Sequence, residues 1–187
     1  MIISWIVLGI LVLAILWIIL AYNSLVSLRN QVINGWKQID VQLKRRHDLI
    51  PNLVETVKGI MKFEQQTLTQ VIEARNKAIA AQGIAEKATQ ENVLTGALRQ
   101  LFALVENYPN LKSNENVAKL QEELVSTENR IGFARQFYND IATRFNIALA
   151  VFPTNIIAGM FGFKSQELFE ITDTSEKEVP KVDLNLK

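Results

Sequence analysis

Hydrophobic and polar positions divide the chain into one apolar run and a series of amphipathic stretches. Residues 2–22 carry no charged side chain, and a helix of about 20 apolar residues matches the ~30 Å hydrocarbon core of a bilayer. Trp5, Trp17 and Tyr22 lie near its ends, where aromatic rings favour the membrane interface. The pattern predicts a transmembrane anchor over residues 1–22. A cleavable signal peptide is the alternative, but a basic start and an Ala-x-Ala site are missing.

An apolar stripe continues directly after this run. Its members recur about every 3.6 residues, the period of one face of a helix: Leu25, Leu28, Val32, Trp36, Ile39 and Leu43. The membrane helix is therefore expected to run on into an amphipathic helix without a joint. Pro51 is expected to end that helix and open the next, with Asp48 as its cap, because proline lacks an N–H and favours a first turn.

Similar stretches follow up to residue 152, each bounded by helix breakers such as Gly83, Pro109 and Pro153. Short connections between helices favour an up-down arrangement. The predicted fold class is all-α: an N-terminal transmembrane helix continuous with an antiparallel four-helix bundle over residues 23–152. Its helices are expected at about 23–50, 51–82, 89–108 and 114–152.

The segment after the bundle is apolar, and residues 145–163 carry no formal charge. Residues 153–170 are expected to pack on the end of the bundle or on the membrane surface. Packing on the bundle is preferred, and a second span is the weakest alternative because Pro153 and two glycines suit lipid poorly. Residues 171–187 are charged and aperiodic, which predicts a flexible tail.

The charge pattern bears on location and partners. The net charge is +1, and cysteine is absent, which argues against nucleic acid as a partner and excludes disulfides and thiolate metal sites. Arg29 and Lys37 follow the apolar run, and nothing basic precedes it. The positive-inside rule then favours an outside N-terminus and a cytoplasmic bundle, in a single-pass protein of the cytoplasmic membrane.

The sequence contains few residue combinations typical of catalytic or metal sites. His47 is the single histidine and lies beside the apolar stripe, where a structural role is preferred. The sequence contains no Glu-x-x-His pair, Gly-rich phosphate loop or nucleophile elbow. We expect no cofactor, no metal site and no catalytic residue. A membrane-associated hydrolase that uses Glu64, Glu128 or His47 is the alternative.

Two groups of polar residues are candidate interaction or structural sites. The first surrounds the expected turn and comprises Asp40, Lys44, Arg45, Arg46, Asp48, Pro51, Asn52 and Glu55. Its basic residues could bind phosphate or an acidic patch, but pairing with acids three or four residues away is preferred. The second group lies on otherwise apolar faces and comprises Glu64, Arg75, Glu128 and Arg135. Isolated buried charges are costly, so these four are expected to pair and fix helix register.

Longer motifs resemble the LemA family over about residues 22–169. They include Leu53-Val54-Glu55-Thr56-Val57-Lys58-Gly59, Tyr108-Pro109, Thr127-Glu128-Asn129-Arg130-Ile131, Tyr138-Asn139 and Gly162-Phe163. The resemblance implies a bacterial or archaeal membrane protein with one span, a four-helix bundle and an outside N-terminus. No molecular activity is established for the family, so no catalytic residue carries over. Members often have His-Glu where this chain has Phe63-Glu64, so any role of that histidine is lost here.

These observations favour a protein that acts through contacts, as a scaffold or envelope-associated module. Its expected partners are the membrane and other proteins, with self-association left open. A transmembrane sensor is the alternative, since a continuous helix can carry a shift across the bilayer to the bundle.

Overall fold

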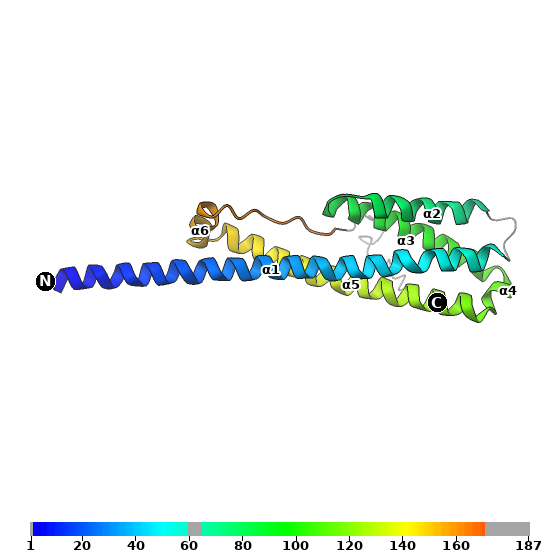
Figure 1. Cartoon of the computed structure of the whole chain (residues 1–187), viewed down its shortest axis with the longest axis horizontal. Coiled ribbons are helices and arrows are strands. Elements are labelled where there is room, and N and C mark those ends of the chain that lie inside the picture. The colour runs from blue at the N-terminus through cyan, green and yellow to red at the C-terminus, as the bar shows by residue number, and fades with distance from the viewer. Residues whose placement is uncertain (1, 60–64, 171–187) are drawn as a thin grey trace, which may run out of the picture. The chain divides into compact units, whose positions relative to one another are not determined.

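The computed structural model describes residues 2–59 and 65–170, and within these ranges the chain is helical without any strand. The helices are α1 (Ile2–Lys58), α2 (Gln65–Ala80), α3 (Ile84–Glu106), α4 (Pro109–Lys112), α5 (Glu115–Ala150) and α6 (Thr154–Met160) (Figure 1). They confirm the predicted all-α class. The chain divides into two compact units: Met1–Leu49 with Glu122–Phe169, and a second built mainly from Ile50–Gln121.

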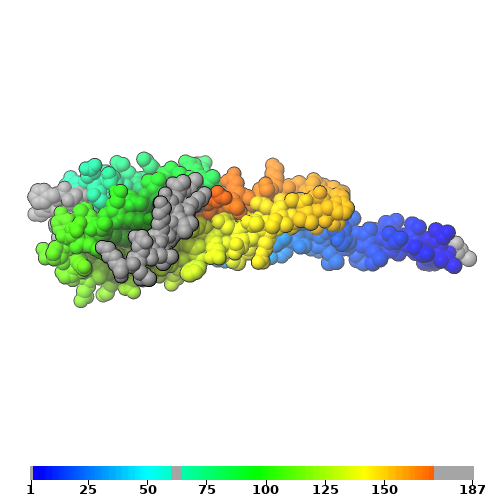
Figure 2. Space-filling view, turned by 180° about the vertical axis from the view of Figure 1, so that it is seen from behind, coloured from blue at the N-terminus to red at the C-terminus, as the bar shows by residue number. Residues whose placement is uncertain are grey.

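The first helix, α1, runs through 57 residues. The predicted lack of a joint between the apolar run and the amphipathic stripe is confirmed. Its N-terminal part is long and apolar enough to cross a membrane, and none of its most apolar 18-residue window is buried. On the face seen in Figure 2, no other part of the chain covers the N-terminal end of this segment, drawn in blue. The stripe that follows is buried, with Leu25, Val32, Ile39 and Leu43 at most 2% exposed.

The helix end expected at Pro51 is wrong, because α1 continues through this proline to Lys58. An interior proline costs about 3 kcal/mol. Buried aliphatic side chains follow it at helical spacing: Leu53, Val54 and Val57 are at most 2% exposed. Each such side chain contributes roughly 1.5–3 kcal/mol when fully buried. Together they exceed the cost of the proline, so the helix does not break.

In the first unit, α1 and α5 lie side by side and antiparallel (Figure 1). They come close together at Gly35, where an added Cβ would lie 3.4 Å from the Cα of Tyr138, at van der Waals contact. Buried residues of α5 complete this core, namely Leu124, Ile131, Tyr138, Ala142 and Phe145.

The chain reverses after α5 and returns along the same helix pair. A turn with a cis Phe152–Pro153 peptide leads into α6, which is bent by 93° from α5. Gly162 then adopts a φ of 68°, a left-handed conformation that favours glycine. The residues that follow form an extended segment without regular structure. We call residues 163–169 the strap.

In the second unit, α2 and α3 pack against each other as a helical hairpin (Figure 1). Gly83, with a φ of 78°, precedes α3. The expected start of this helix at residue 89 is too late, because Ala88 is already a core residue at 2% exposure. The buried side chains of α2 are Leu68, Val71, Ala74 and Ala78.

Candidate functional site

A buried ion pair joins α1 to α5. The guanidinium of Arg46 donates a hydrogen bond to the carboxylate of Glu128. Arg46 is 1% exposed, while the side chain of Glu128 is 46% exposed. A buried cation is costly unless it is paired, so the ion pair with Glu128 offsets the free-energy cost of burying Arg46. The sequence placed these two residues in different candidate groups, and the structure brings them together.

A second ion pair lies beside the first. Arg45 donates to the Glu123 carboxylate at 2.5 Å, and both side chains are about half exposed. These partners of Arg45 and Arg46 lie 78 and 82 residues further along the chain, and the sequence analysis did not anticipate them. Local spacing cannot reveal such partners, because they depend on which helices become neighbours.

The other residues of the first candidate group do not gather around a turn. Asp40, Lys44, Asp48, Pro51, Asn52 and Glu55 are all exposed along the continuous α1 helix. Glu55 lies 3.8 Å from Lys58, an ordinary surface pair. The turn around which they were expected to gather is therefore absent, because α1 is continuous here.

The second candidate group is only partly visible. Glu64 lies outside the described residues, whereas Arg75 and Arg135 are half-buried. Arg75 donates to the side-chain oxygen of its neighbour Asn76 at 3.3 Å. A four-residue polar layer thus stays a prediction. His47 is buried at 8% exposure, beside the stripe where the sequence placed it.

Two asparagines of α5 hold the strap. Asn146 donates to the carbonyl of Gln166 and accepts from its N–H, both at 2.8 Å. Asn139 does the same with Phe169, at 3.1 and 2.8 Å. Each amide side chain therefore satisfies both backbone groups of one strap residue, as a neighbouring strand would.

The spacing of these contacts explains why the arrangement fits. The two asparagines are seven residues apart on a helix, a rise of about 10.5 Å. Gln166 and Phe169 are three residues apart in an extended chain, a distance of about 10 Å. The sequence analysis did not identify these hydrogen bonds between the two asparagines and the strap. Its only signal was the pair of asparagines at heptad spacing on one helix.

Aromatic residues add to the hold on the strap. The hydroxyl of Tyr138 donates to the carbonyl of Glu167 at 2.7 Å, and burial, followed by the nearby Glu167 carboxylate, raises the pKa of this phenol. The ring of Trp36 lies 5.7 Å from that of Tyr138 and 5.9 Å from that of Phe169. The strap, α1 and α5 thus share one aromatic core.

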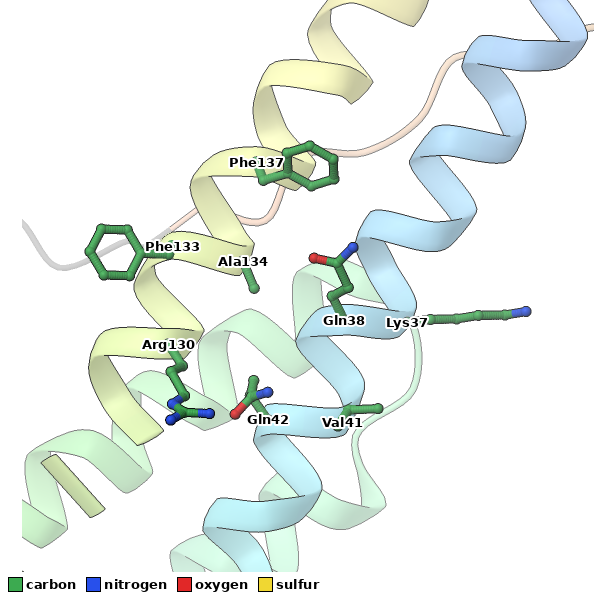
Figure 3. Close-up of a pocket in the computed structure, with 8 residues that line it drawn as sticks. All are labelled: Lys37, Gln38, Val41, Gln42, Arg130, Phe133, Ala134 and Phe137. Atoms are coloured by element: carbon green, nitrogen blue, oxygen red, sulfur yellow. The ribbon is translucent and has the colours of Figure 1, made fainter. Parts of the chain in front are cut away.

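An open groove lies between α1 and α5, with a volume of about 580 Å³ (Figure 3). It is lined by Lys37, Gln38, Val41, Gln42, Arg130, Phe133, Ala134 and Phe137. Figure 3 shows Gln38 and Ala134 between the two helices, and Lys37 directed away from α5. The lining combines apolar, amide and basic side chains, and it includes no carboxylate.

The three large apolar residues of this groove are exposed to solvent. Phe133 is 73% exposed, Val41 63% and Phe137 44%. Phe133 and Phe137 are four residues apart, so they lie on one face of α5. The sequence analysis did not select them, although two phenylalanines at this spacing outside the buried stripe were a signal. An exposed apolar patch with a polar rim is typical of a protein interaction surface.

Within residues 2–59 and 65–170, no three acidic, histidine or cysteine side chains come close enough to hold a metal ion. Glu128, one of the hydrolase candidates, forms an ion pair with Arg46. Neither Glu128 nor His47 lines the groove.

Comparison with known proteins relates the chain to one family. The LemA family profile matches residues 35–184. Protein LemA of Metamycoplasma hominis is 26% identical over 167 residues, which cover 87% of this chain and 73% of that protein. Magnetosome protein MamQ 2 of Paramagnetospirillum magneticum is 26% identical over 82% of the chain. MamQ of Magnetospirillum gryphiswaldense is 25% identical over 81%. The chain spans about two thirds of the length of these magnetosome proteins, 66% and 65%.

Proposed function

The chain belongs to the LemA family, and on that premise we propose that it is a membrane-anchored scaffold that binds a partner protein in the groove between α1 and α5. The observation that carries this proposal is the exposure of Phe133 and Phe137 beside basic residues. An exposed apolar patch with polar residues around it often marks a protein interaction site. A partner that covers them gives them a role.

The proposed anchor is the apolar start of α1, which crosses the cytoplasmic membrane once. The proposed orientation has the N-terminus outside and the helical body in the cytoplasm, since basic residues follow the span. The chain contains no cysteine, so single cysteines introduced at Ser4 and Gln82 can be labelled in intact cells. Labelling of Ser4 alone supports the orientation, and labelling of Gln82 alone reverses it.

The proposed body is an up-down four-helix bundle formed by α1, α2, α3 and α5. Support comes from the second unit, which contains the end of α1, both helices of the hairpin and the start of α5. The apolar faces of α2 and α3 and the short connections around α4 favour the same arrangement.

We propose an amphipathic helix with acidic residues as the partner segment. A groove between two helices accepts a third helix whose apolar residues recur every three or four positions. The two exposed phenylalanines offer the apolar contact. Lys37 and Arg130 supply positive charge, and no acid in the lining opposes it, so an acidic rim on the partner would be complementary.

The test places a photo-crosslinking phenylalanine analogue at Phe133 or Phe137 in native membranes. One protein is expected in the adducts from both positions. Thr143 is the matched control, because it is exposed on the same helix but lies about 80° around from Phe133 and about 120° around from Phe137. Arg130→Glu should abolish the adducts, whereas Lys112→Glu, in the second unit, should not. Equal adducts from Thr143, or adducts that survive Arg130→Glu, would contradict the proposed groove.

A second candidate function is a transmembrane sensor, favoured by the continuity of α1 from Ile2 to Lys58. A helix without a joint can transmit rotation and translation. Insertion of one residue at Asn23 rotates the following part by about 100° and shifts it by about 1.5 Å. If the protein is a sensor, this insertion changes crosslinking at Phe133. If it is a tether, crosslinking is unaffected.

A further inference from the structure

The turn from α5 into α6 leaves a group of apolar side chains uncovered. Its members are 50% to 75% exposed and comprise Val151, Phe152, Ile156, Met160 and Phe161. We call these five residues the α6 tip. They lie in a stretch, residues 145–163, without any formal charge. The opposite side of α6 packs inward, since Ile157 and Ala158 are at most 4% exposed.

Ring contacts place the α6 tip beside the end of the apolar run of α1. The ring of Phe161 lies 4.7 Å from that of Tyr22, and the ring of Phe163 lies 5.9 Å from it. Tyr22 is the last residue of the apolar run at residues 2–22, where an aromatic side chain is typical of the membrane interface. The α6 tip is therefore at the depth at which α1 leaves the bilayer.

The direction of α6 suits a membrane surface. It is bent by 93° from α5, and α5 runs antiparallel to α1 in the same unit (Figure 1). If α1 crosses the membrane along its normal, α6 lies close to the membrane plane. This is the orientation of an interfacial helix, which buries its apolar face at the boundary between headgroups and acyl chains.

Charges begin where the α6 tip ends, and the first ones are basic. The guanidinium of Arg29 lies 5.5 Å from the centre of the Phe163 ring, and Arg29 is the first charged residue after the span. It is seven residues beyond Tyr22, a rise of about 10 Å. Lys164 follows Phe163 directly and is exposed. Both cations are at the level where anionic headgroups attract basic residues.

We propose that the α6 tip inserts into the interface of the membrane that α1 crosses, as a second contact with lipid. This inference rests on the proposed anchor. The alternative of a second span, formed by α5 and α6 together, fits poorly because the two helices are bent by 93°. Beyond the bend, α6 has only seven residues, or about 10 Å, against a core of ~30 Å. Three features fit a lipid surface: the uncharged face of the α6 tip, its position beside Tyr22, and the direction of the α6 helix.

The test measures the depth of single cysteines in the full chain. Bimane-labelled cysteines replace Leu13, Met160 or Val41, and the protein is reconstituted in vesicles of phosphatidylcholine and phosphatidylglycerol. Nitroxides at a shallow or a deep acyl carbon quench bimane at the same depth. Leu13 should be quenched best by the deep probe and Met160 best by the shallow probe. Val41, an exposed apolar residue far from Tyr22, should be quenched by neither.

Each outcome decides one question. Deep quenching at Leu13 without quenching at Met160 overturns the α6 contact and leaves the anchor intact. Deep quenching at both positions means a second span and also overturns it. Absence of quenching at Leu13 contradicts the anchor itself. A further variant combines Phe152→Glu with Met160→Glu. In this variant, a bimane-labelled cysteine at Ile156 should lose its quenching by the shallow probe. A bimane-labelled cysteine at Leu13 should keep its quenching by the deep probe. If Ile156 remains quenched, the α6 tip does not hold the segment in the interface.

Discussion

The two ends of the α1–α5 pair are held together by different chemistry. Arg45 and Arg46 reach Glu123 and Glu128 at one end. At the other end, aromatic rings are in contact. The ring of Tyr22 lies 4.7 Å from that of Phe161 and 5.9 Å from that of Phe163, and the ring of Phe145 lies 6.3 Å from that of Phe163. The ionic end demands one partner for each charge, because an uncompensated buried charge is costly. The aromatic end tolerates exchange among apolar groups, since its contacts are weakly directional.

The difference teaches where a single substitution does most harm. Loss of one ring leaves its neighbours in an apolar environment that they already favour. Loss of the carboxylate beside a buried guanidinium leaves a charge where water cannot solvate it well. The ionic end should therefore be less tolerant of substitution, although both ends contribute to the same helix pair.

Glu128→Ala should have the largest effect, because it removes the carboxylate beside Arg46. We expect a loss of about 3 kcal/mol in the free energy of unfolding, measured by urea denaturation of the detergent-solubilised protein. The double variant Arg46→Met with Glu128→Leu should recover most of it, since both charges are then gone. A double variant as unstable as Glu128→Ala would show that packing, and not the buried charge, causes the loss.

Asn146→Ala should release the strap at Gln166. Two hydrogen bonds are lost, each worth about 1 kcal/mol, so opening becomes easier by about 2 kcal/mol. Hydrogen exchange of the Gln166 amide should speed up about 30-fold. Asn129→Ala, at an exposed position of the same helix, is the matched control. Unchanged exchange at Gln166 would mean that the asparagine does not hold the strap.

Tyr138→Phe should cost about 1 kcal/mol, for the bond to the Glu167 carbonyl. It should also change the response to alkali. Because the pKa of Tyr138 is raised in the folded protein, its contribution is fully present below the unfolded pKa of ~10 and is lost as pH rises through the folded value. Denaturation midpoints from about pH 9 upward should fall more steeply for the native protein than for Tyr138→Phe. Parallel curves would rule out this linkage.

Glu123→Ala should have the smallest effect. Arg45 and Glu123 are each about half exposed, and surface pairs contribute about 0.2–1 kcal/mol. High salt should reduce even this difference, because it screens exposed charges. A loss as large as that of Glu128→Ala would show that burial of the cation does not distinguish the two pairs.

The sequence predicted most of the helices because their apolar positions follow a clear period. The predicted helix over 114–152 agrees with α5 at Glu115–Ala150, and the lack of a joint at Tyr22 follows from one continuous stripe. Pro51 misled the prediction because the local cost of a proline is visible in the sequence, whereas the burial of Leu53 and Val57 depends on the fold.

The candidate sites were harder to predict, for a related reason. Arg46 and Glu128 were both selected as candidates, in different groups, but their pairing requires knowing that α1 lies beside α5. Asn139 and Asn146 act on the backbone of the strap, which carries no side-chain signal. Phe133 and Phe137 are conspicuous only after the structure shows them exposed.

The unbroken α1 helix affects which proteins can reach the groove, because it fixes the distance between the groove and the membrane surface. With Tyr22 at the membrane surface, Lys37 and Gln42 are 15 and 20 residues further on, or roughly 22 and 30 Å above the bilayer. A partner anchored in the same membrane by a flexible linker would need at least about seven extended residues to span the lower height. Length would thus select among partners of equal affinity.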